Sequence, residues 1–377
     1  MSVTIVEVKT KRELAQFIYL PLRLHKTNPN WVPPVYMDEW KLFNPAKNKA
    51  FSYCDTILIL SKKNNKVVGR AMGIIHKGYN ELKGEKTGRF GWFESIDDQE
   101  VAHAMLDYLQ DWVKARGMEK LIGPFGFSDK DPQGFLIDGY EHRAVLSTSY
   151  HPPYYRKLIE NEGFVKDQDL VEYLIPIPET IPEFYQRIYD RASKNHQVRI
   201  KEFKRKKDLK PYIIPVLQLM NKTFSEIYGS FPLTEKEMIS LAKEYLPVLD
   251  PEFVKIVLTD TDEVIAFTIA MPDVAEGLKK ADGKLLPLGI FYILRAMKRT
   301  DQLVLLLGGI RPDFQGKGLD ALMGIKMIET ATRRKFRVID SHVELESNVK
   351  VRAEMEKMGG KVAKVFRIYE KLLSSSQ

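Results

Sequence analysis

The residues best suited to chemistry lie in one stretch of the C-terminal half, Leu303–Arg337. An apolar run ends at Ile310, a Gln-Gly-Lys-Gly motif follows at Gln315–Gly318, and a helical pattern begins directly after it. Glycine has no Cβ, so the backbone of such a loop can approach an anion closely. The free N–H groups at the start of the helix then point at that anion. The pattern predicts a phosphate-type anion site.

Composition places this stretch in a soluble globular protein. The chain has 377 residues, of which 44% are hydrophobic, and its net charge is +8. At about 150 residues per domain, two domains are expected rather than one. The mild positive charge fits an anionic small ligand as well as nucleic acid. The single cysteine, Cys54, allows no intramolecular disulfide, and the charged N-terminus does not resemble a signal peptide, so we expect a cytoplasmic protein.

An internal repeat indicates two copies of one unit. The twelve residues from Val198 match the twelve from Val3 at six positions, an offset of 195. Two further matches keep nearly the same spacing: Lys66–Gly69 with Glu263–Ala266, and Glu160–Gly163 with Glu356–Gly359. Prolines at 176, 178 and 182 mark a break between the copies. We therefore predict domains at residues 1–176 and 198–377, with a linker helix at 177–197.

Short local signals fix several elements. Asn64-Asn65 between two β-branched runs predicts a tight hairpin turn. Thr234, with Glu237 three residues later, predicts a capped helix start. Residues 98–116 place apolar side chains on one helical face, and Gly117 is expected to end that helix.

The second copy resembles the GNAT superfamily, the acyl-CoA-dependent N-acyltransferases. The resemblance rests on the strand, the motif Gln315–Gly318 and the following helix, then on Asn348 and the run Glu356–Gly359. The chain departs from the family pattern where Met355 replaces a tyrosine and Gly360 a phenylalanine. The resemblance covers residues 198–372 by motif, and residues 1–176 match by element order. It implies an α/β (α+β) fold of tandem GNAT-like domains, each a mixed, mostly antiparallel sheet with flanking helices.

The resemblance also implies a cofactor site. Acetyl-CoA or another acyl-CoA would be the co-substrate, with its pyrophosphate on the glycine loop and its pantetheine arm paired with the strand edge near Ile310. Lys317 and Arg352 are candidates to meet a phosphate, and no metal is implied. The cofactor-binding residues that we expect are Ile310, Arg311, Gln315, Gly316, Lys317, Gly318, Leu319, Asp320 and Asn348.

Acyl transfer to an amine also needs a base for the amine proton and an acid for the leaving thiolate. With Met355 in place of the usual tyrosine, carboxylates on the neighbouring strand are the candidates. Glu344 and Glu346 share one face by period-two alternation, together with His342. Tyr292 and Tyr369 are further possible acids.

The first copy differs at the corresponding position. Residues 94–100 contain four carboxylates and no glycine where an anion would be bound. Like charges repel a pyrophosphate. We expect the first copy to keep the fold, lack the cofactor and form one wall of the substrate cleft.

Three functions remain open on the sequence. The first is N-acyl transfer, above all acetyl transfer, to a small amine or amino-acid-like acceptor. The second is a non-catalytic module that binds CoA or a partner, and the third is an aminoacyl-tRNA-dependent transferase, based on the basic run Lys201–Lys210. We expect a small-molecule amine as partner, without a membrane and without nucleic acid, and the oligomeric state is open.

Overall fold

The computed structural model describes residues 2–146, 148–194, 197–246 and 248–373, and within them thirteen strands form one continuous sheet. In chain order the strands are β1 (Thr4–Glu7), β2 (Cys54–Lys63), β3 (Lys66–His76), β4 (Thr87–Ser95), β5 (Lys120–Gly123), β6 (Phe135–Asp138), β7 (Val165–Pro176), β8 (Val198–Glu202), β9 (Val254–Thr259), β10 (Val264–Pro272), β11 (Gln302–Ile310), β12 (Val338–Leu345) and β13 (Lys361–Leu372).

Helices flank this sheet on both faces. They are α1 (Lys11–His25), α2 (Tyr36–Leu42), α3 (Lys77–Lys83), α4 (Gln99–Lys114), α5 (Tyr154–Glu160), α6 (Glu183–Ser193), α7 (Ile213–Thr223), α8 (Glu235–Tyr245), α9 (Ala275–Lys280), α10 (Gly289–Arg299), α11 (Leu319–Arg333) and α12 (Val349–Lys357). Short 3-10 helices lie at Lys49–Ser52, Lys206–Tyr212, Pro251–Phe253 and Pro312–Phe314. The prediction of an α/β fold with a mixed sheet is confirmed.

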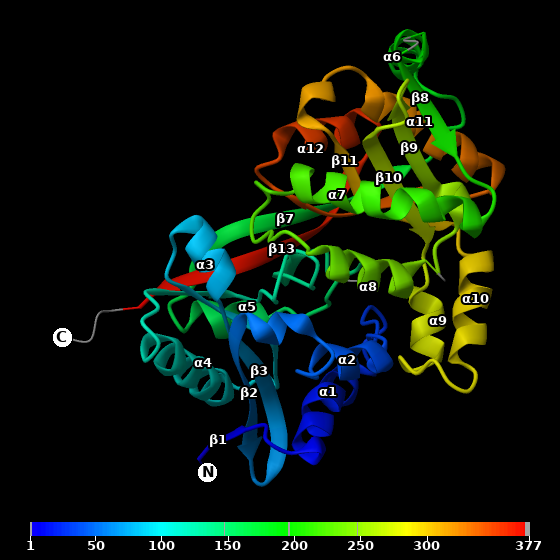
Figure 1. Cartoon of the computed structure of the whole chain (residues 1–377). Helices are drawn as coiled ribbons and strands as arrows, with labels where there is room; N and C mark the ends of the chain where they lie inside the picture. The colour runs from blue at the N-terminus through cyan, green and yellow to red at the C-terminus, as the bar shows by residue number, and fades with distance from the viewer. Residues whose placement is uncertain (1, 147, 195–196, 247, 374–377) are drawn as a thin grey trace.

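The sheet has two halves, one on each side of the central strands β13 and β7 (Figure 1). The strand order is β1-β2-β3-β4-β5-β13-β7-β12-β11-β10-β9-β8, so β4 and β11 hold equivalent places. β4 is antiparallel to β3 and parallel to β5, and β11 is likewise antiparallel to β10 and parallel to β12. Each parallel ladder is short: Thr87–Arg89 pairs with Lys120–Ile122, and Gln302–Val304 pairs with Val338–Asp340. The two halves therefore repeat the same strand arrangement.

The last strand of each half lies in the sheet of the other. β7, at the end of the first half, pairs with β12, while β13, at the end of the chain, pairs with β5 and β6. The two strands also pair with each other over nearly their whole length and cross the middle of the molecule (Figure 1). This exchange joins the halves through backbone hydrogen bonds. The division at residues 177–197 stays a prediction, and α6 lies inside it.

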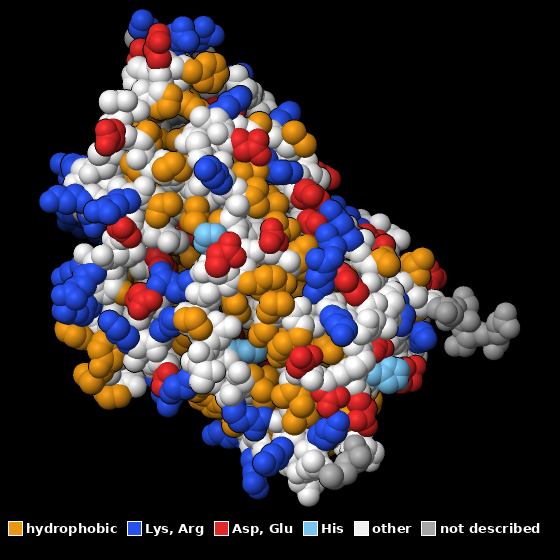
Figure 2. Space-filling model, turned by 180° about the vertical axis from the view of Figure 1, so that it is seen from behind, with side chains coloured by type: hydrophobic (Ala, Val, Ile, Leu, Met, Phe, Trp, Pro, Cys, Tyr) orange, Lys and Arg blue, Asp and Glu red, His pale blue; other side chains and the backbone are white. Residues whose placement is uncertain are grey.

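Apolar faces of the helices build a core on each side of the sheet. In the first half, α4 packs Val101, Met105 and Leu109 against one face, and α1 packs Phe17 against the other. In the second half, α7 covers one face of β9 and β10, and α11 covers the opposite face. On the surface, Lys and Arg side chains are interspersed with Asp and Glu (Figure 2).

The local signals are confirmed. Asn64 and Asn65 both have positive φ at the β2–β3 turn, and Gly117 has a positive φ just after α4. Thr234 accepts a hydrogen bond from the backbone N–H of Glu237, whose side chain accepts one in return from the backbone N–H of Thr234. In the described part of the chain, every helix falls short of the length and apolar character that a membrane crossing requires.

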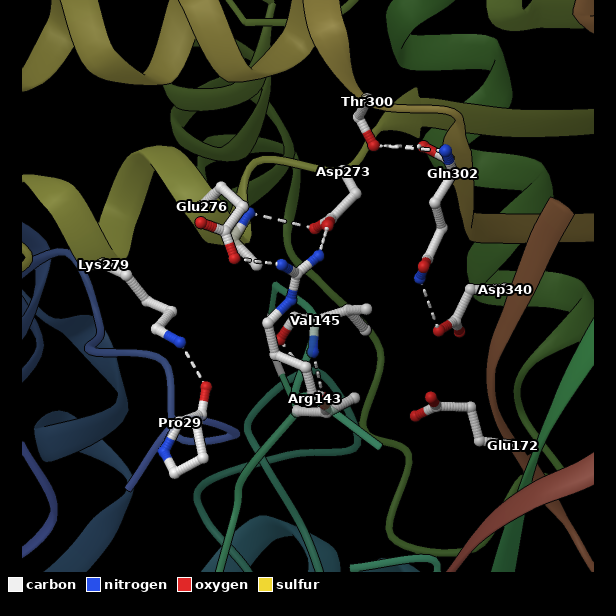
Figure 3. Close-up of polar contacts among 12 residues, drawn as sticks. Pro29, Arg143, Val145, Glu172, Asp273, Glu276, Lys279, Thr300, Gln302 and Asp340 are labelled. Atoms are coloured by element: carbon white, nitrogen blue, oxygen red, sulfur yellow. Dashed lines mark hydrogen bonds and ion pairs between the residues drawn. The ribbon is translucent and has the colours of Figure 1, made fainter. Parts of the chain in front are cut away.

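A buried ion pair supports the strand exchange. Lys364 on β13 pairs with Glu172 on β7, and both side chains are buried. The Lys364 Nζ also donates to the carbonyl of Arg143, at 2.8 Å. Burial and the neighbouring carboxylate of Asp340 raise the pKa of Glu172. Figure 3 shows Glu172 beside Asp340, which accepts a hydrogen bond from Gln302.

A second buried polar group stabilises the first half. Glu94 was expected in the connection between a strand and a helix, but it lies inside β4 and points into the core. It accepts hydrogen bonds at 2.7 Å from both His25 and Tyr155, and its other oxygen faces Arg70 at 3.8 Å. Burial alone would raise the pKa of Glu94, but the interactions with His25 and Arg70 outweigh it and bring the pKa to about 2.

We expect Glu94→Gln to lower the free energy of unfolding at neutral pH by about 3 kcal/mol, from a pKa that falls from 4.5 to about 2. Because the folded pKa is depressed, this contribution is complete above pH 4.5 and is lost as the pH falls toward 2. Urea unfolding at several pH values measures both effects. Glu119→Gln, in an exposed ion pair with Lys86, is the control and should change stability by less than about 1 kcal/mol. Equal effects of the two variants would contradict the prediction.

Candidate functional site

The predicted anion loop connects β11 to α11. Gly316 has φ +72° and Gly318 has φ +80°, a left-handed conformation that favours glycine. Gly318 is the N-cap of α11, and among the described residues this helix start has no side-chain cap hydrogen bond. A Cβ on Gly316 would meet no atom within 4 Å. The start of α11 therefore presents uncapped N–H groups beside an open loop, as an anion site requires.

The strand before the loop has a free edge. The β11–β12 ladder ends at the pair Val304–Asp340, and beyond it the two strands separate, although β11 continues to pair with β10 as far as Ile310. A bulge in the β10–β11 ladder, which skips Leu306, lies where the separation begins. Backbone groups that lack a ladder partner can pair with an extended ligand, as a strand would.

A cavity of about 1040 Å³ fills the space between the separated strands. One end is lined by Gln315 and Gly316, and other parts of the wall come from α7, α8, α11 and α12. The wall is mostly apolar, with side chains that include Leu217, Met220, Leu241, Phe267, Met323 and Met355. Residues 129–131 and Gln133 of the first half also line it. The cavity slightly exceeds the roughly 300–1,000 Å³ of a typical small-molecule site.

Glu344 is the predicted catalytic residue that reaches this cavity. It lies near the end of β12, opposite Val171 of β7, and lines the wall. Burial raises the pKa of its carboxyl group to about 7. A carboxylate with that pKa can take a proton near neutral pH.

His342 lines the same wall. Its backbone has φ +59°, at an irregularity of the β12–β7 ladder, and its N–H donates to Asp340 at 2.9 Å. Burial lowers the pKa of the imidazole, and its Nε2 is buried with no hydrogen-bond partner among the described residues. A neutral imidazole with a free nitrogen at the cavity wall can accept or donate one hydrogen bond to a ligand.

No family model matches the chain. Among curated proteins, the bacterial ceramide synthase of Caulobacter vibrioides is 28% identical over 384 residues, covering 99% of this chain and 98% of that protein. Protein YghO of Escherichia coli is 26% identical, covering 96% and 93%. Both similarities extend over the whole chain rather than over one half.

Solved structures show the same architecture. A tandem GNAT protein from the clavulanic acid biosynthesis pathway superposes with a TM-score of 0.56 at 11% identity, covering 100% of both chains. A GCN5-related N-acetyltransferase from Sphaerobacter thermophilus gives a TM-score of 0.52 at 10% identity, covering 100% of this chain and 97% of the other. The protein has a two-lobed GNAT fold.

In this GNAT fold, the second lobe places most of the predicted cofactor residues around the cavity. Its lining includes Ile310, Gln315, Gly316, Asp320 and Asn348. The Asn348 side chain caps α12 by accepting from the N–H of Val351 at 3.5 Å. Leu319 is buried under the loop, so only its backbone can serve a ligand. Contact between these residues and a cofactor stays a prediction.

Other predicted residues have different partners. Arg311 pairs with Asp313 at 2.7 Å and with Glu263 at 2.6 Å, and these contacts raise its pKa. The Lys317 ammonium lies 4.6 Å from the centre of the Phe314 ring. Arg352 donates to Tyr173 and to the carbonyl of Glu346, both at 3.0 Å. None of the three cations lines the cavity in the described part of the chain.

Glu346 lies beyond the end of β12 and pairs with Lys166, at 2.6 Å, outside the cavity. The alternation argument grouped it with Glu344, but the strand ends at Leu345 and the chain turns away. The structure therefore separates the two predicted carboxylates.

The tyrosines of the cavity were missed by sequence reasoning. Tyr369 is buried in the first-lobe core and donates to Glu160, and neither it nor Tyr292 lines the cavity. Tyr185 of α6 does line it, and its hydroxyl donates to Glu354 at 3.1 Å, beside Met355. Burial raises the pKa of Tyr185, which keeps the phenol protonated. No local signal relates α6 to α12, because they meet only through tertiary packing.

The first lobe closes its equivalent gap with its own chain. Beyond the β4–β5 ladder, the N–H of Phe125 donates to the carbonyl of Phe90 at 2.8 Å, where a ligand would pair in the second lobe. A Cβ on Gly91 would lie 2.8 Å from the Phe125 carbonyl oxygen, so the two segments are in close contact. Loss of the cofactor by the first lobe stays a prediction, and this filled gap supports it independently of the acidic residues.

We expect Gly318→Ala to lower the free energy of unfolding by about 1–2 kcal/mol, because a Cβ disfavours a left-handed backbone. The new Cβ would also lie 2.8 Å from the Ile188 side chain on α6. Gly324→Ala, in the same helix and with nothing within 4 Å of its Cβ, is the control and should stabilise by about 0.5–1 kcal/mol. Chemical denaturation measures both variants. Stabilisation by both substitutions would contradict the assigned loop conformation.

Proposed function

We propose that the protein is an N-acyltransferase that moves a long acyl chain from acyl-CoA to the amine of a long-chain acceptor. The observation that carries this proposal is the apolar cavity, which runs from the glycine loop past Glu344. An acetyl group and a small amine would leave most of its wall in contact with water. Two hydrocarbon chains would cover that wall, at a gain of about 0.8 kcal/mol per buried CH₂.

The name of one relative supports the same substrate class. The curated relative from Caulobacter vibrioides is named a bacterial ceramide synthase, and its similarity spans 99% of this chain. A ceramide is the amide of a fatty acyl group and a long-chain amine. The proposal therefore replaces the expected acetyl group and small acceptor with long chains on both substrates.

In the proposed reaction, the amine nitrogen attacks the thioester carbonyl, an N–C bond forms and the C–S bond breaks. Glu344 takes the proton that the amine loses, and the phenol of Tyr185 is the group that we assign to protonate the departing thiolate. The backbone N–H groups at Gly318–Asp320 would hold the pyrophosphate, and the free edge of β11 would pair with the pantetheine arm. The products are an amide and free CoA; Glu344 then releases its proton to solvent and Tyr185 takes one up, so atoms and charge balance over the cycle.

Ligand binding tests the proposal first. Palmitoyl-CoA should raise the unfolding temperature by several degrees and more than acetyl-CoA does, because ligands that bind only the folded state stabilise it. Gly316→Glu should abolish the shift by placing a carboxylate at the anion site. Gly117→Glu is a matched control, since both glycines have positive φ and open space around the Cβ.

Turnover is then measured as thiol release and amide formation with palmitoyl-CoA and a panel of amines. A long-chain amine should be acylated, and small amines should not. A thermal shift without amide from any amine would instead identify a CoA-binding module. The absence of a shift with every acyl-CoA would reject both functions.

The pH dependence tests the base. Since Glu344 must be deprotonated to accept a proton, kcat/KM should rise with pH through an apparent pKa of about 7. Glu344→Gln should lower kcat by about 10²–10⁴-fold and remove this dependence. Glu346→Gln, two residues away and outside the cavity, should keep both rate and profile. A full-rate Glu344→Gln enzyme would exclude this residue as the base.

A further inference from the structure

α10 presents an apolar face to solvent. Five large apolar side chains in and just before this helix are between 48% and 72% exposed: Leu286, Leu288, Ile290, Phe291 and Leu294. Ile290, Phe291 and Leu294 follow i, i+1, i+4 spacing, so they share one side of the helix. Adjacent apolar side chains of this size on one exposed face are typical of an interaction surface.

The side of the same helix next to this face is packed. Ile293 and Met297 contact a cluster formed by Met271, Val274 and Leu278. α9 and α10 pack closely, because a Cβ on Gly277 would lie 2.6 Å from the Cα of Ile293. The exposed apolar side chains of α10 therefore lie outside the packed cluster that holds this helix on the protein.

Polar contacts fix the base of this helical hairpin to the first lobe. Arg143 pairs with Asp273 and Glu276, and Lys279 donates to the carbonyl of Pro29 (Figure 3). Lys26 pairs with Asp282 at 2.8 Å. The carboxylates on this side of the hairpin are thus occupied by cations of the first lobe, and the apolar face of α10 is held rigidly outward.

Cations surround the exposed face. Five exposed basic side chains lie on or beside α10: Lys280, Lys284, Arg295, Lys298 and Arg299. Within the described ranges, none of them forms an ion pair with a carboxylate. Where α9 and α10 reach the edge of the molecule, Figure 2 shows hydrophobic side chains below a group of Lys and Arg side chains. An apolar face bordered by unpaired cations complements a surface with anionic headgroups above hydrocarbon.

We propose that this face, formed by Leu286–Arg299 together with the adjoining Lys280 and Lys284, docks the protein on an anionic lipid surface. The apolar side chains would enter the boundary between headgroups and acyl chains, and the five cations would contact lipid phosphates. The expectation of no membrane partner considered segments that cross a bilayer, whereas a helix lying in the interface needs no such length.

One apolar cluster, Met271, Val274 and Leu278, links the packed side of α10 to the cavity wall. Leu306 of β11 and Leu146 both line the cavity, and both pack against the cluster that holds Ile293 and Met297. A lipid surface at α10 would thus lie close to the site that accepts long-chain substrates. The docking itself depends only on the exposed face, and it goes beyond the proposed reaction.

Vesicle flotation tests the docking with the full chain. Wild-type protein should float with phosphatidylcholine vesicles that contain phosphatidylglycerol, bind less to phosphatidylcholine alone, and lose affinity as salt is raised. The triple variant I290S/F291S/L294S should bind about 10³-fold more weakly, since each buried side chain contributes about tenfold. Leu82→Ser removes a similarly exposed side chain from α3 and is the control.

A charge variant tests the electrostatic part. R295Q/K298Q should lower binding to anionic vesicles by about 25-fold, at about fivefold per charge. K157Q/K210Q removes two exposed cations elsewhere and should bind as wild type does. Equal binding of R295Q/K298Q and wild type, or no preference of wild type for anionic vesicles, would overturn the proposal.

Two further readouts separate the possible failures. If light scattering shows a wild-type dimer that I290S/F291S/L294S dissociates, and no vesicle binding occurs, the face is a self-association surface and the proposal is wrong. The thermal shift with palmitoyl-CoA should be unchanged in every α10 variant. Vesicle binding without any acyl-CoA shift would uphold the docking and reject only the proposed reaction.

Discussion

The exchange of β7 and β13 is the constraint on which the rest of the structure depends. Each strand completes the sheet of the opposite lobe and pairs with the other along the middle of the molecule. Buried backbone N–H and C=O groups must be paired, so neither sheet is complete without the other lobe. The buried side chains of Lys364 and Glu172 also meet where these two strands pair. The two lobes therefore form one unit around a shared interior.

Within the described residues, the two lobes differ in the gap between their parallel strands. In both lobes the two parallel strands separate after three residue pairs. In the first lobe, the segment around Phe125 pairs with the freed strand and fills the gap. In the second lobe the gap stays open and continues into the apolar cavity, to which the first lobe contributes residues 129–131 and Gln133. One lobe thus supplies the opening and the other helps to wall it.

Environment gives two carboxylates of this chain opposite properties. Glu94 is buried, but its contacts with His25 and Arg70 bring its pKa to about 2, so it is a fixed structural charge. Glu344 is partly buried at an apolar wall, and desolvation raises its pKa to about 7, in the range of a base. Charge pairing also shapes the surface around α10. Asp282 and Glu276 pair with Lys26 and Arg143 of the first lobe, and not with the exposed cations on and beside α10.

Local sequence determined the elements whose signals are local. The Asn64-Asn65 turn, the capping box of Thr234 and Glu237, and the strand–glycine–helix order at Gln315–Gly318 all lie where the residues indicated. These features depend on contacts within a few residues, which side-chain type and spacing determine. The internal repeat predicted two similar units, and the two halves of the sheet have the same strand arrangement.

Tertiary structure alone decided how these elements meet. The alternation of side chains along a strand grouped Glu344 with Glu346. In the structure β12 ends at Leu345, and the Glu346 carboxylate pairs with Lys166. The exchange of β7 and β13, the arrival of Tyr185 beside α12, and the outward face of α10 involve residues far apart in the chain. Such contacts leave no periodic pattern in the sequence of either segment, because each contact depends on which other segment the folded chain places against it.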